Sequence, residues 1–436
     1  MSVETKLKFD REAITQYSKQ SGEPEWMTSL RLQGFDQYSQ LQLPKLEKIK
    51  LDNWNVDGFV PFATHAPVAE TNALPEEIQA LIAQGEGEQK AILVQRDASV
   101  IYTYIPEALR SQGVVFGDLQ SALATHGEMI QKHFMQKDSK VNSHKLSALH
   151  AAAWSGGVFL YVPKNVEVNI PIQAVFYATG KDAGLFPHVL IVAETHSSVS
   201  YTDTYLNLGE TEGIHNGVAE VHVGPGAKVK YTSVRTFEQS VTDYIHRHAT
   251  VENDGRMEWV LGEMNDSNTV TENSTHLLGN GSTSDSKLVT IGSGTQRESV
   301  VSKVVHTGKH SDSQVLVKGV LKDEATAILN GVTFIEKGAT KSNGEQAENV
   351  LMLSPKARGD ANPILLIDED DVKAGHAASA GQINPMQIFY LMSRGISKKE
   401  AQRLIIDGFV APVVDEIKQP GVKALLERTI ERKVSQ

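Results

Sequence analysis

The sequence contains no cysteine among its 436 residues. Without a thiol the chain can form no disulfide, can use no cysteine nucleophile, and can build no thiolate metal site by itself. Any chemistry that needs sulfur ligands must therefore obtain them from a second protein.

Long hydrophobic runs and an excess of basic residues are also missing. The formal net charge is −11, which argues against nucleic acid or an anionic membrane as the main partner. The longest weakly polar run, 148–162, is interrupted by His150 and Ser155 and is shorter than the roughly 20 apolar residues that cross a bilayer. The first residues, MSVETKLKFDREA, are polar and lack the apolar segment of a secretory signal. We expect a cytoplasmic protein that binds neither nucleic acid nor membrane.

The motifs of nucleotide-binding enzymes are absent as well. GPGAK and GSGTQ are glycine turns that no helical pattern follows. Gly308 and Lys309 resemble part of a phosphate-binding loop, but Lys303 stands where such a loop has glycine and His310 where it has a hydroxyl group. We therefore expect that the chain is not an enzyme and that any ATP hydrolysis belongs to a partner.

The composition divides the chain into three regions. Residues 1–150 have mostly helical patterns, with a helix predicted to start near Pro24 and another within 74–83. Residues 151–380 consist of short β-branched runs separated by Gly, Asn, Asp and Ser, and residues 381–436 return to helical patterns. We expect a mostly helical N-terminal domain, a β core domain and a C-terminal helical domain with these bounds.

The central region contains an internal repeat. Apolar residues with the same spacing recur about every 30 residues, in the copies 162–170, 192–201, 223–231 and 251–259. Each copy ends in two apolar residues with period 2, which is typical of a strand, and GPGAK and NDGR between them form turns. The repeat indicates stacked units, as in a β-solenoid or a propeller, with a non-repetitive β-sandwich as the alternative. The pattern fades after residue 280.

Two helices with clear boundary signals follow the β region. The pair Asn384–Pro385 predicts the start of the first helix and Gly395 its end. Residues 397–400 have the spacing of a capping box for the second helix, whose apolar stripe includes Leu404 and Ile405. These helices either cap the open end of a stacked β core or form a docking surface for a partner.

Two histidines in the β region offer a candidate metal site. His246 and His248 have the i, i+2 spacing of neighbours on one face of a strand, and Glu252 follows them. Two imidazoles and a carboxylate could share a metal ion, as in part of a cupin motif, but Ser240 and Trp259 replace the glycines of that motif. A metal-dependent β-fold enzyme that uses these three residues is the alternative function.

The most distinctive segment is 360–409. An apolar strand and four acids, 368–371, lead to a short loop that carries Lys373 and His376, and the two helices follow. Small residues flank His376 and permit close approach of another backbone, and imidazole binds iron as well as zinc. The four carboxylates could attract a hard cation, but a solvated turn is the favoured interpretation because at most two of them could converge from a strand.

Several motifs between residues 321 and 409 resemble the SufB/SufD family of iron–sulfur cluster assembly scaffolds. They are LKDEATAILNG, KGAT, Gln346, LMLSPKA, Pro363, DDVKAGH, Gly381 and IFYLMSRGI followed by Gly408–Phe409. The earlier segment LSALHAAAWSGGVFLYVPKNVEV resembles the start of the family's β domain. In the SufB branch a cysteine is thought to hold the nascent cluster, so a chain without cysteine resembles the SufD branch.

The resemblance implies a fold and a set of partners. The fold is a right-handed parallel β-helix between N-terminal and C-terminal α-helical domains, which agrees with the repeat. The resemblance implies that the chain pairs with SufB through the β-helix, binds the ATPase SufC through its C-terminal helices, and forms a homodimer when alone. We expect Leu404, Ile405 and Phe409 to contact SufC.

The resemblance also implies where the functional site lies. His376 is expected at the SufB interface facing a SufB thiolate, supported by Lys373 and Asp371, so that a nascent iron–sulfur cluster is shared between the chains and the isolated chain holds no cofactor. Ala374 stands where some members have cysteine, so that thiol cannot be needed here. Complexes of the family have been linked to reduced flavin, although nothing in this sequence marks a flavin site. A purely structural subunit that only holds SufB and SufC is the third interpretation.

Overall fold

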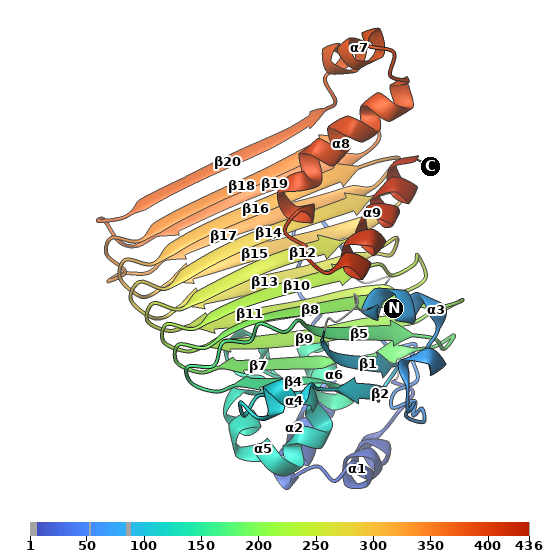
Figure 1. Cartoon of the computed structure of the whole chain (residues 1–436), viewed down its shortest axis with the longest axis vertical. Helices are drawn as coiled ribbons and strands as arrows, with labels where there is room; N and C mark the ends of the chain where they lie inside the picture. Colours follow the sequence, from blue (N-terminus) through green and yellow to red (C-terminus); the bar gives the residue numbers. More distant parts are fainter. Residues whose placement is uncertain (1–6, 52–53, 84–88, 436) are drawn as a thin grey trace.

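The computed structural model describes residues 7–51, 54–83 and 89–435. The chain is mainly β, with a parallel β-solenoid of about eight turns between N-terminal and C-terminal helices (Figure 1). This confirms the predicted fold class and excludes the β-sandwich alternative. None of the helices in the described ranges is both long enough and apolar enough to cross a membrane.

Two long sheets form the walls of the solenoid. The strand order is β2-β1-β5-β8-β10-β12-β14-β16-β18-β20 in the first sheet and β19-β17-β15-β13-β11-β9-β7-β4-β3 in the second, where β6 also pairs with β9. From β8 onward successive strands alternate between the sheets, so each turn of the solenoid adds one strand to each wall. The strands are β1 (Ala91–Arg96), β2 (Ser99–Tyr104), β3 (Val115–Asp118), β4 (Gly157–Val162), β5 (Ile172–Ala178), β6 (Gly184–Leu185), β7 (His188–Ala193), β8 (Ser198–Asn207), β9 (Ile214–Val223), β10 (Lys228–Arg235), β11 (Thr242–Val251), β12 (Arg256–Glu263), β13 (Thr269–Leu277), β14 (Thr283–Gly292), β15 (Arg297–His306), β16 (Asp312–Leu321), β17 (Thr326–Ile335), β18 (Asn343–Met352), β19 (Arg358–Ile367) and β20 (Lys373–Gln382).

The sequence repeat corresponds to the register of the first sheet. Tyr201, Tyr231 and Trp259 pair in β8, β10 and β12, and all three side chains are buried in the interior of the solenoid. The first copy fits less well than the sequence predicts, because Ile172 and not Ile170 pairs with Tyr201. Aromatic and β-branched side chains that stack between coils therefore produce the visible part of the repeat.

The solenoid continues beyond residue 280, where the sequence pattern fades. The position of Trp259 is taken by Ser286 in β14, Val315 in β16 and Gln346 in β18, all in unbroken register. The polar residues Ser286 and Gln346 at two of these three inward positions hide the repeat, while backbone hydrogen bonds between coils preserve the structure.

The N-terminal helices cover the outer face of the second sheet. The helix α5 packs against β4 and β7, and buried side chains such as Met27, Trp154 and Phe159 join the helices to that sheet. The strands β1 and β3 precede residue 151, yet β1 pairs with β5 and β3 pairs with β4 of the solenoid. The division into domains at residues 150 and 380 stays a prediction. The elements are α1 (Arg11–Gln20), α2 (Glu25–Tyr38), η1 (Thr71–Ala73), α3 (Glu76–Ile82), α4 (Glu107–Arg110), α5 (Leu119–His133), η2 (Lys137–Ser139) and α6 (Lys145–Ala153).

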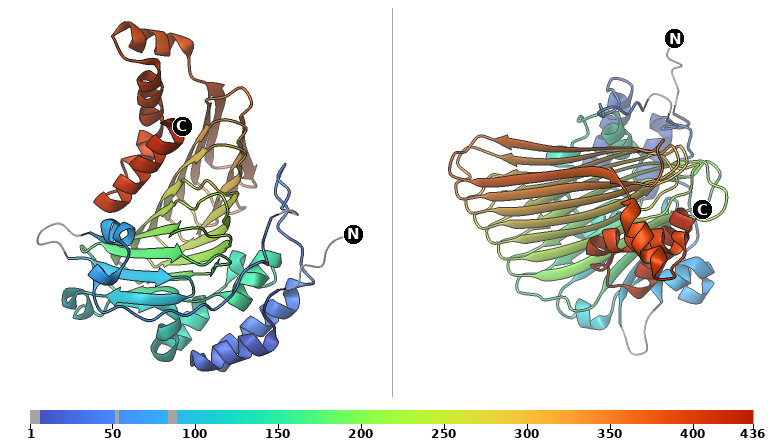
Figure 2. Two further views of the ribbon diagram at one scale, coloured as in Figure 1. Left: turned by 90° about the vertical axis from the view of Figure 1, so that its right-hand side faces the viewer. Right: turned by 90° about the horizontal axis from the view of Figure 1, so that it is seen from above.

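The C-terminal helices are α7 (Pro385–Ser393), α8 (Lys398–Val414) and α9 (Pro420–Ser435). The predicted caps are present, because the side chain of Asn384 accepts from the backbone of α7 and that of Ser397 accepts from the backbone of α8. The helix α8 contacts β12, β14 and β16, where Ile406 and Val410 are buried with Val289. Helices α8 and α9 thus lie along the side of the solenoid and do not close its end (Figure 2).

Candidate functional site at the open end of the solenoid

The solenoid ends in two strands that have a hydrogen-bonded neighbour on one side only. β19 pairs with β17 and β20 pairs with β18, and no further strand of the described chain follows either of them. Every residue of β20 is exposed, whereas the inward residues of earlier strands are buried. Unpaired strand edges of this kind are templates for pairing with another chain.

His376 lies in the middle of β20 and not in the loop that its sequence neighbours predict. Its flanking Ala, Gly and Ser residues have low strand propensity, which explains the wrong prediction. The ladder with β18 imposes the extended conformation on them, since it pairs ten residues in register from Asn343–Lys373 to Met352–Gln382.

The register places His376 next to Gln346 of β18. Equivalent residues of neighbouring strands in register point to the same side, so the imidazole belongs to the row of Trp259 and faces the interior of the solenoid. Gln346 is only 4% exposed and is fixed at both ends of its amide. Its Oε1 accepts from Thr333 Oγ1 at 2.9 Å, and its Nε2 donates to the carbonyl oxygen of Ile364 at 3.2 Å.

The two residues expected to support His376 do not surround it. Lys373 is three positions away on the same strand and so points to the opposite face. Asp371 lies in the preceding turn, where its carboxylate accepts from Lys341 Nζ at 2.9 Å. Both residues lie near the open end, but the strand and the turn direct their side chains away from the imidazole.

The acidic run 368–371 forms a turn between β19 and β20, in agreement with the solvated turn predicted from the sequence. Glu369 accepts from the backbone N–H of Gly338 at 2.9 Å, and this bond is the main reason that the pKa of its carboxyl is lowered. Lys337 lies 3.6 Å from Asp370 and 3.7 Å from Glu369. Two of the acids thus share Lys337 and a third pairs with Lys341, and the described residues form no metal-ion cluster here.

A buried carboxylate, Glu348, lies one strand below the open end and was not identified from the sequence. It is fully buried, and neither of its oxygens has a hydrogen-bonding partner among the described residues. Burial raises the pKa of its carboxyl to about 7. Only the strand register shows that Glu348 faces the interior, because a charged residue in a strand is ordinarily expected to face solvent.

The alternative metal site is not assembled. His246 and His248 both lie in β11, but the first contacts Glu272 Oε2 at 3.2 Å and the second contacts Ser274 Oγ at 3.0 Å. Glu252 lies in the turn beyond the end of the strand. The described residues contain no group of three or more His, Asp or Glu side chains arranged to hold a metal ion.

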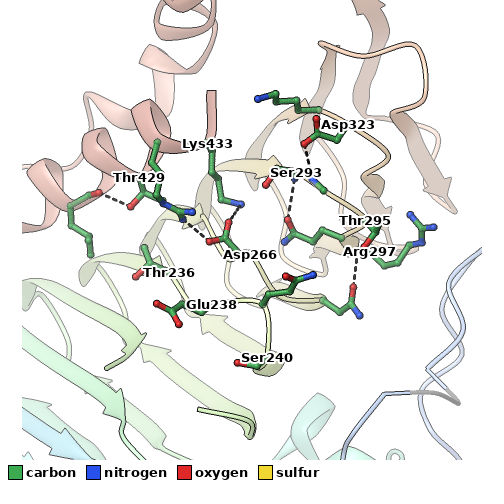
Figure 3. A pocket seen from close by; sticks show the side chains of 17 residues that line it. Thr236, Glu238, Ser240, Asp266, Ser293, Thr295, Arg297, Asp323, Thr429 and Lys433 are labelled. Carbon is green, nitrogen blue, oxygen red and sulfur yellow. Dashed lines mark hydrogen bonds and ion pairs between the residues drawn. The ribbon is translucent and has the colours of Figure 1, made fainter. Parts of the chain in front are cut away.

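A polar cleft of about 1130 Å³ lies between α9 and the turns of the central coils (Figure 3). Lys433 crosses it, buried, and pairs with Asp266 at 3.0 Å, and Arg432 pairs with the same carboxylate at 2.7 Å. Asp323 accepts from the backbone N–H of Gly294 at 3.0 Å. These side chains are engaged in ion pairs and backbone hydrogen bonds within the cleft and do not present a reactive set, so the cleft is a weaker candidate than the open end.

The expected docking stripe on α8 divides into exposed and packed residues. Leu404 is 41% exposed, whereas Phe409 packs against the solenoid with Lys318 Nζ 4.6 Å from its ring centre. Ile405 lines a shallow groove between α7 and α8. The most exposed apolar side chains of this region lie on α7 and were not singled out from the sequence: Met386, Phe389, Tyr390 and Met392.

Comparisons with known proteins agree with this geometry. The family model "SUF system FeS cluster assembly, SufBD core domain" matches residues 176–409, and the "SufBD protein N-terminal region" matches residues 89–174. The chain is 47% identical, over the full length of both chains, to the iron–sulfur cluster assembly protein SufD of Bacillus subtilis (strain 168). It is 28% identical to a SufBD family protein of Staphylococcus epidermidis (strain ATCC 12228 / FDA PCI 1200), over 93% of this chain and 88% of that protein.

Proposed function

Because the chain belongs to the SufBD family of the SUF system for iron–sulfur cluster assembly, we propose that it is a scaffold subunit that builds a cluster jointly with SufB. In this proposal the chain pairs with SufB through the open end of the solenoid and contributes His376 to the shared site. The chain supplies no thiolate, since it contains no cysteine. The protein acts in the cytoplasm.

One observation carries the proposal: the coordinating side chain lies at the unpaired end of the fold. The interior-facing positions of β20 are Ala374, His376, Ala378, Ala380 and Gln382, and His376 carries the one ionisable side chain among these five residues. The alanines leave room for side chains of a second subunit. A partner that extends the solenoid at β19 and β20 would meet this imidazole directly.

The proposed chemistry follows from the donor types. Neutral imidazole is a good ligand for iron near neutral pH, and SufB supplies the thiolates that this chain lacks. A cluster held by both thiolate and imidazole ligands from two chains loses part of its ligand set when the chains move apart. We propose that this makes the finished cluster easier to release than a cluster held by four thiolates of one chain.

We propose that the ATPase SufC docks on α7 and the adjoining part of α8. Four large apolar side chains of α7 are exposed, and exposed apolar groups that gather on one helix are typical of a protein interface. Leu404 and Ile405 extend this surface from α8. Since α8 also packs on β12, β14 and β16, movement of the docked ATPase would be transmitted to the solenoid. The chain itself hydrolyses no ATP in this proposal.

The experiment is anaerobic cluster reconstitution on the purified complex of this chain with SufB and SufC. His376→Ala should leave the three proteins co-eluting but abolish the absorbance and Mössbauer signals of the cluster. The matched control is Lys373→Ala, which removes an exposed side chain from the opposite face of the same strand. A normal cluster yield from His376→Ala would leave the purely structural subunit as the correct interpretation.

A further inference from the structure

Glu348 is a charged group that the chain buries without satisfying it. Its side chain is 0% exposed, and both carboxylate oxygens lack a hydrogen-bonding partner among the described residues. The deeper buried acids of the solenoid differ in this respect: Glu263, for example, pairs with Arg235 and with Arg247. An unpaired buried carboxylate is costly, so its retention at one position calls for a specific reason.

The neighbours of Glu348 on its own wall, toward the body of the solenoid, are all apolar. The same register position is occupied by Val317 in β16, Leu288 in β14 and Leu261 in β12, all buried. On the opposite wall the carboxylate lies against Gly331 of β17, where an added Cβ would overlap Oε1. The glycine therefore provides the space that the carboxylate occupies.

The side toward the open end is different. The residue above Glu348 in register is Ala378, which contributes only a methyl group to the layer above the carboxylate. His376 lies on the same face of β20, and Gln346 lies on the same face of β18. With about 4.8 Å between strands and about 6.6 Å between alternate residues, the Cα atoms of His376 and Glu348 are about 8 Å apart. Their side chains can therefore reach a common point.

Protonation does not remove the cost of burying the Glu348 side chain. A neutral carboxyl group would still bury a hydroxyl donor and a carbonyl acceptor, and the described residues supply a partner for neither oxygen. The compensating group must come from outside the chain and enter through the open end. A cation fits best, because it can neutralise the carboxylate and accept both of its oxygens as ligands.

We infer that Glu348 is a carboxylate ligand for ferrous iron on its way into the cluster, binding beside the amide of Gln346 and the imidazole of His376. This inference rests on the proposed function, which makes iron the substrate at this end of the solenoid. Carboxylate, amide and imidazole ligands suit iron(II) before sulfide arrives, and thiolates of the partner take over once the cluster forms. Binding involves no change of oxidation state.

The test uses the anaerobic complex of this chain with SufB and SufC, titrated with Fe²⁺ alone in equilibrium dialysis before any sulfur source is added. Glu348→Gln keeps the shape of the side chain but removes the charge, and we expect it to weaken Fe²⁺ binding at least tenfold. Glu345→Gln is the matched control, since Glu345 lies on the same strand, is exposed and points outward. It should change the affinity less than twofold.

A second variant tests the geometry without touching the carboxylate. Gly331→Ala adds a methyl group where Glu348 Oε1 lies, so it should displace the ligand and weaken Fe²⁺ binding in the same way. Unchanged Fe²⁺ affinity in Glu348→Gln would overturn the inference. If that variant instead weakened complex formation and bound Fe²⁺ normally, the compensating cation would be a side chain of the partner and the inference would be wrong.

The outcomes separate this inference from the proposed function. If His376→Ala abolishes the cluster while Glu348→Gln binds Fe²⁺ normally, the scaffold proposal stands and the role of Glu348 is refuted. If His376→Ala builds a normal cluster, the scaffold proposal fails whatever Glu348→Gln does.

Discussion

His376 of β20 occupies the register position of Gln346 of β18, one strand further along the solenoid axis. The same ladder determines which backbone groups of β20 are already bonded. The N–H of Lys373 donates to the carbonyl oxygen of Ser342 at 2.9 Å, so in a parallel pair the odd-numbered residues of β20 bond to β18. The even-numbered residues, including His376, direct their N–H and C=O groups toward the free edge.

This alternation yields a matched pair of proline substitutions. Ala380→Pro removes an N–H group that has no partner in the chain, so it should change the stability of the isolated protein by less than about 1 kcal/mol. It should weaken pairing with SufB on the order of tenfold, because it blocks a hydrogen bond at the free edge. Ala377→Pro removes a bonded N–H group and should lower the melting temperature itself. Analytical ultracentrifugation and thermal unfolding measure the two effects, and equal behaviour of the variants would contradict the edge-pairing interface.

The docking surface proposed on α7 can be distinguished from the packed face of α8. Phe389 is 66% exposed, so Phe389→Asp should leave the melting temperature nearly unchanged and abolish co-purification of SufC. Phe409→Asp buries a charge against the solenoid near Lys318 and should cost about 2 kcal/mol or more of stability. Retained SufC binding by Phe389→Asp would move the docking site elsewhere.

Acid should weaken the attachment of the C-terminal helices to the solenoid. Glu416 accepts from Lys230 and Lys287, each at 2.8 Å, and these hydrogen bonds lower the pKa of its carboxyl to about 2. A lowered folded-state pKa contributes stability above the unfolded value of 4.5 that is lost as the pH falls toward 2. Because the group is partly exposed, we expect less than about 1 kcal/mol.

Hydrogen exchange of 398–414 at pH 3 and pH 7 measures this anchoring contact. The protection factors of α8, which correct for the slower intrinsic exchange in acid, should be lower at pH 3 than at pH 7 in the wild type, and Glu416→Gln should already show the lower protection at pH 7. Asp285, which lies 3.3 Å from Lys287, provides the control substitution Asp285→Asn because it does not reach α8. Identical protection of α8 in wild type and Glu416→Gln would show that apolar packing alone holds the helix.

The fold could be predicted where the residues that stack between coils are large and apolar. Tyr201, Tyr231 and Trp259 occupy one row, so their spacing revealed the solenoid. The helix caps at Asn384 and Ser397 were also predictable, because a cap depends on local side-chain hydrogen bonds.

The candidate site could be predicted only in part. His376 was found through the family motif, but its strand was not, because β20 consists mainly of Ala, Gly and Ser and is extended only by its ladder with β18. Glu348 was missed since the direction of a strand residue depends on a register that the faded repeat no longer reveals. The cause is the same in both cases: pairing between coils is non-local.

One buried acid in the body of the solenoid should make the stability of the whole protein depend on pH. Glu298 is 2% exposed in β15, and burial raises the pKa of its carboxyl to about 7 although Lys433 and a 2.6 Å hydrogen bond from Thr290 favour the charged form. Glu263 also faces it and raises the pKa further, whereas Arg235 lowers it.

The direction of the pH effect follows from proton binding in the two states. Below pH 4.5 the carboxyl is protonated in both states and imposes no penalty. Between about 4.5 and about 7 the unfolded chain ionises while the folded protein keeps its proton, so stability falls as the pH rises and levels off above 7. The full effect is on the order of 3 kcal/mol.

Glu298→Gln keeps the shape and the contact with Thr290 but cannot ionise, so it should raise the melting temperature at pH 8 and leave it nearly unchanged at pH 4.5. Differential scanning calorimetry at several pH values measures this, with Glu324→Gln as a control because Glu324 is on the surface and pairs with Lys356. A constant difference between wild type and Glu298→Gln across the pH range would mean that packing and not ionisation governs the effect. A lower melting temperature of the variant at pH 8 would show that Lys433 already compensates the charge, because then the ionised form would be the stabilising one.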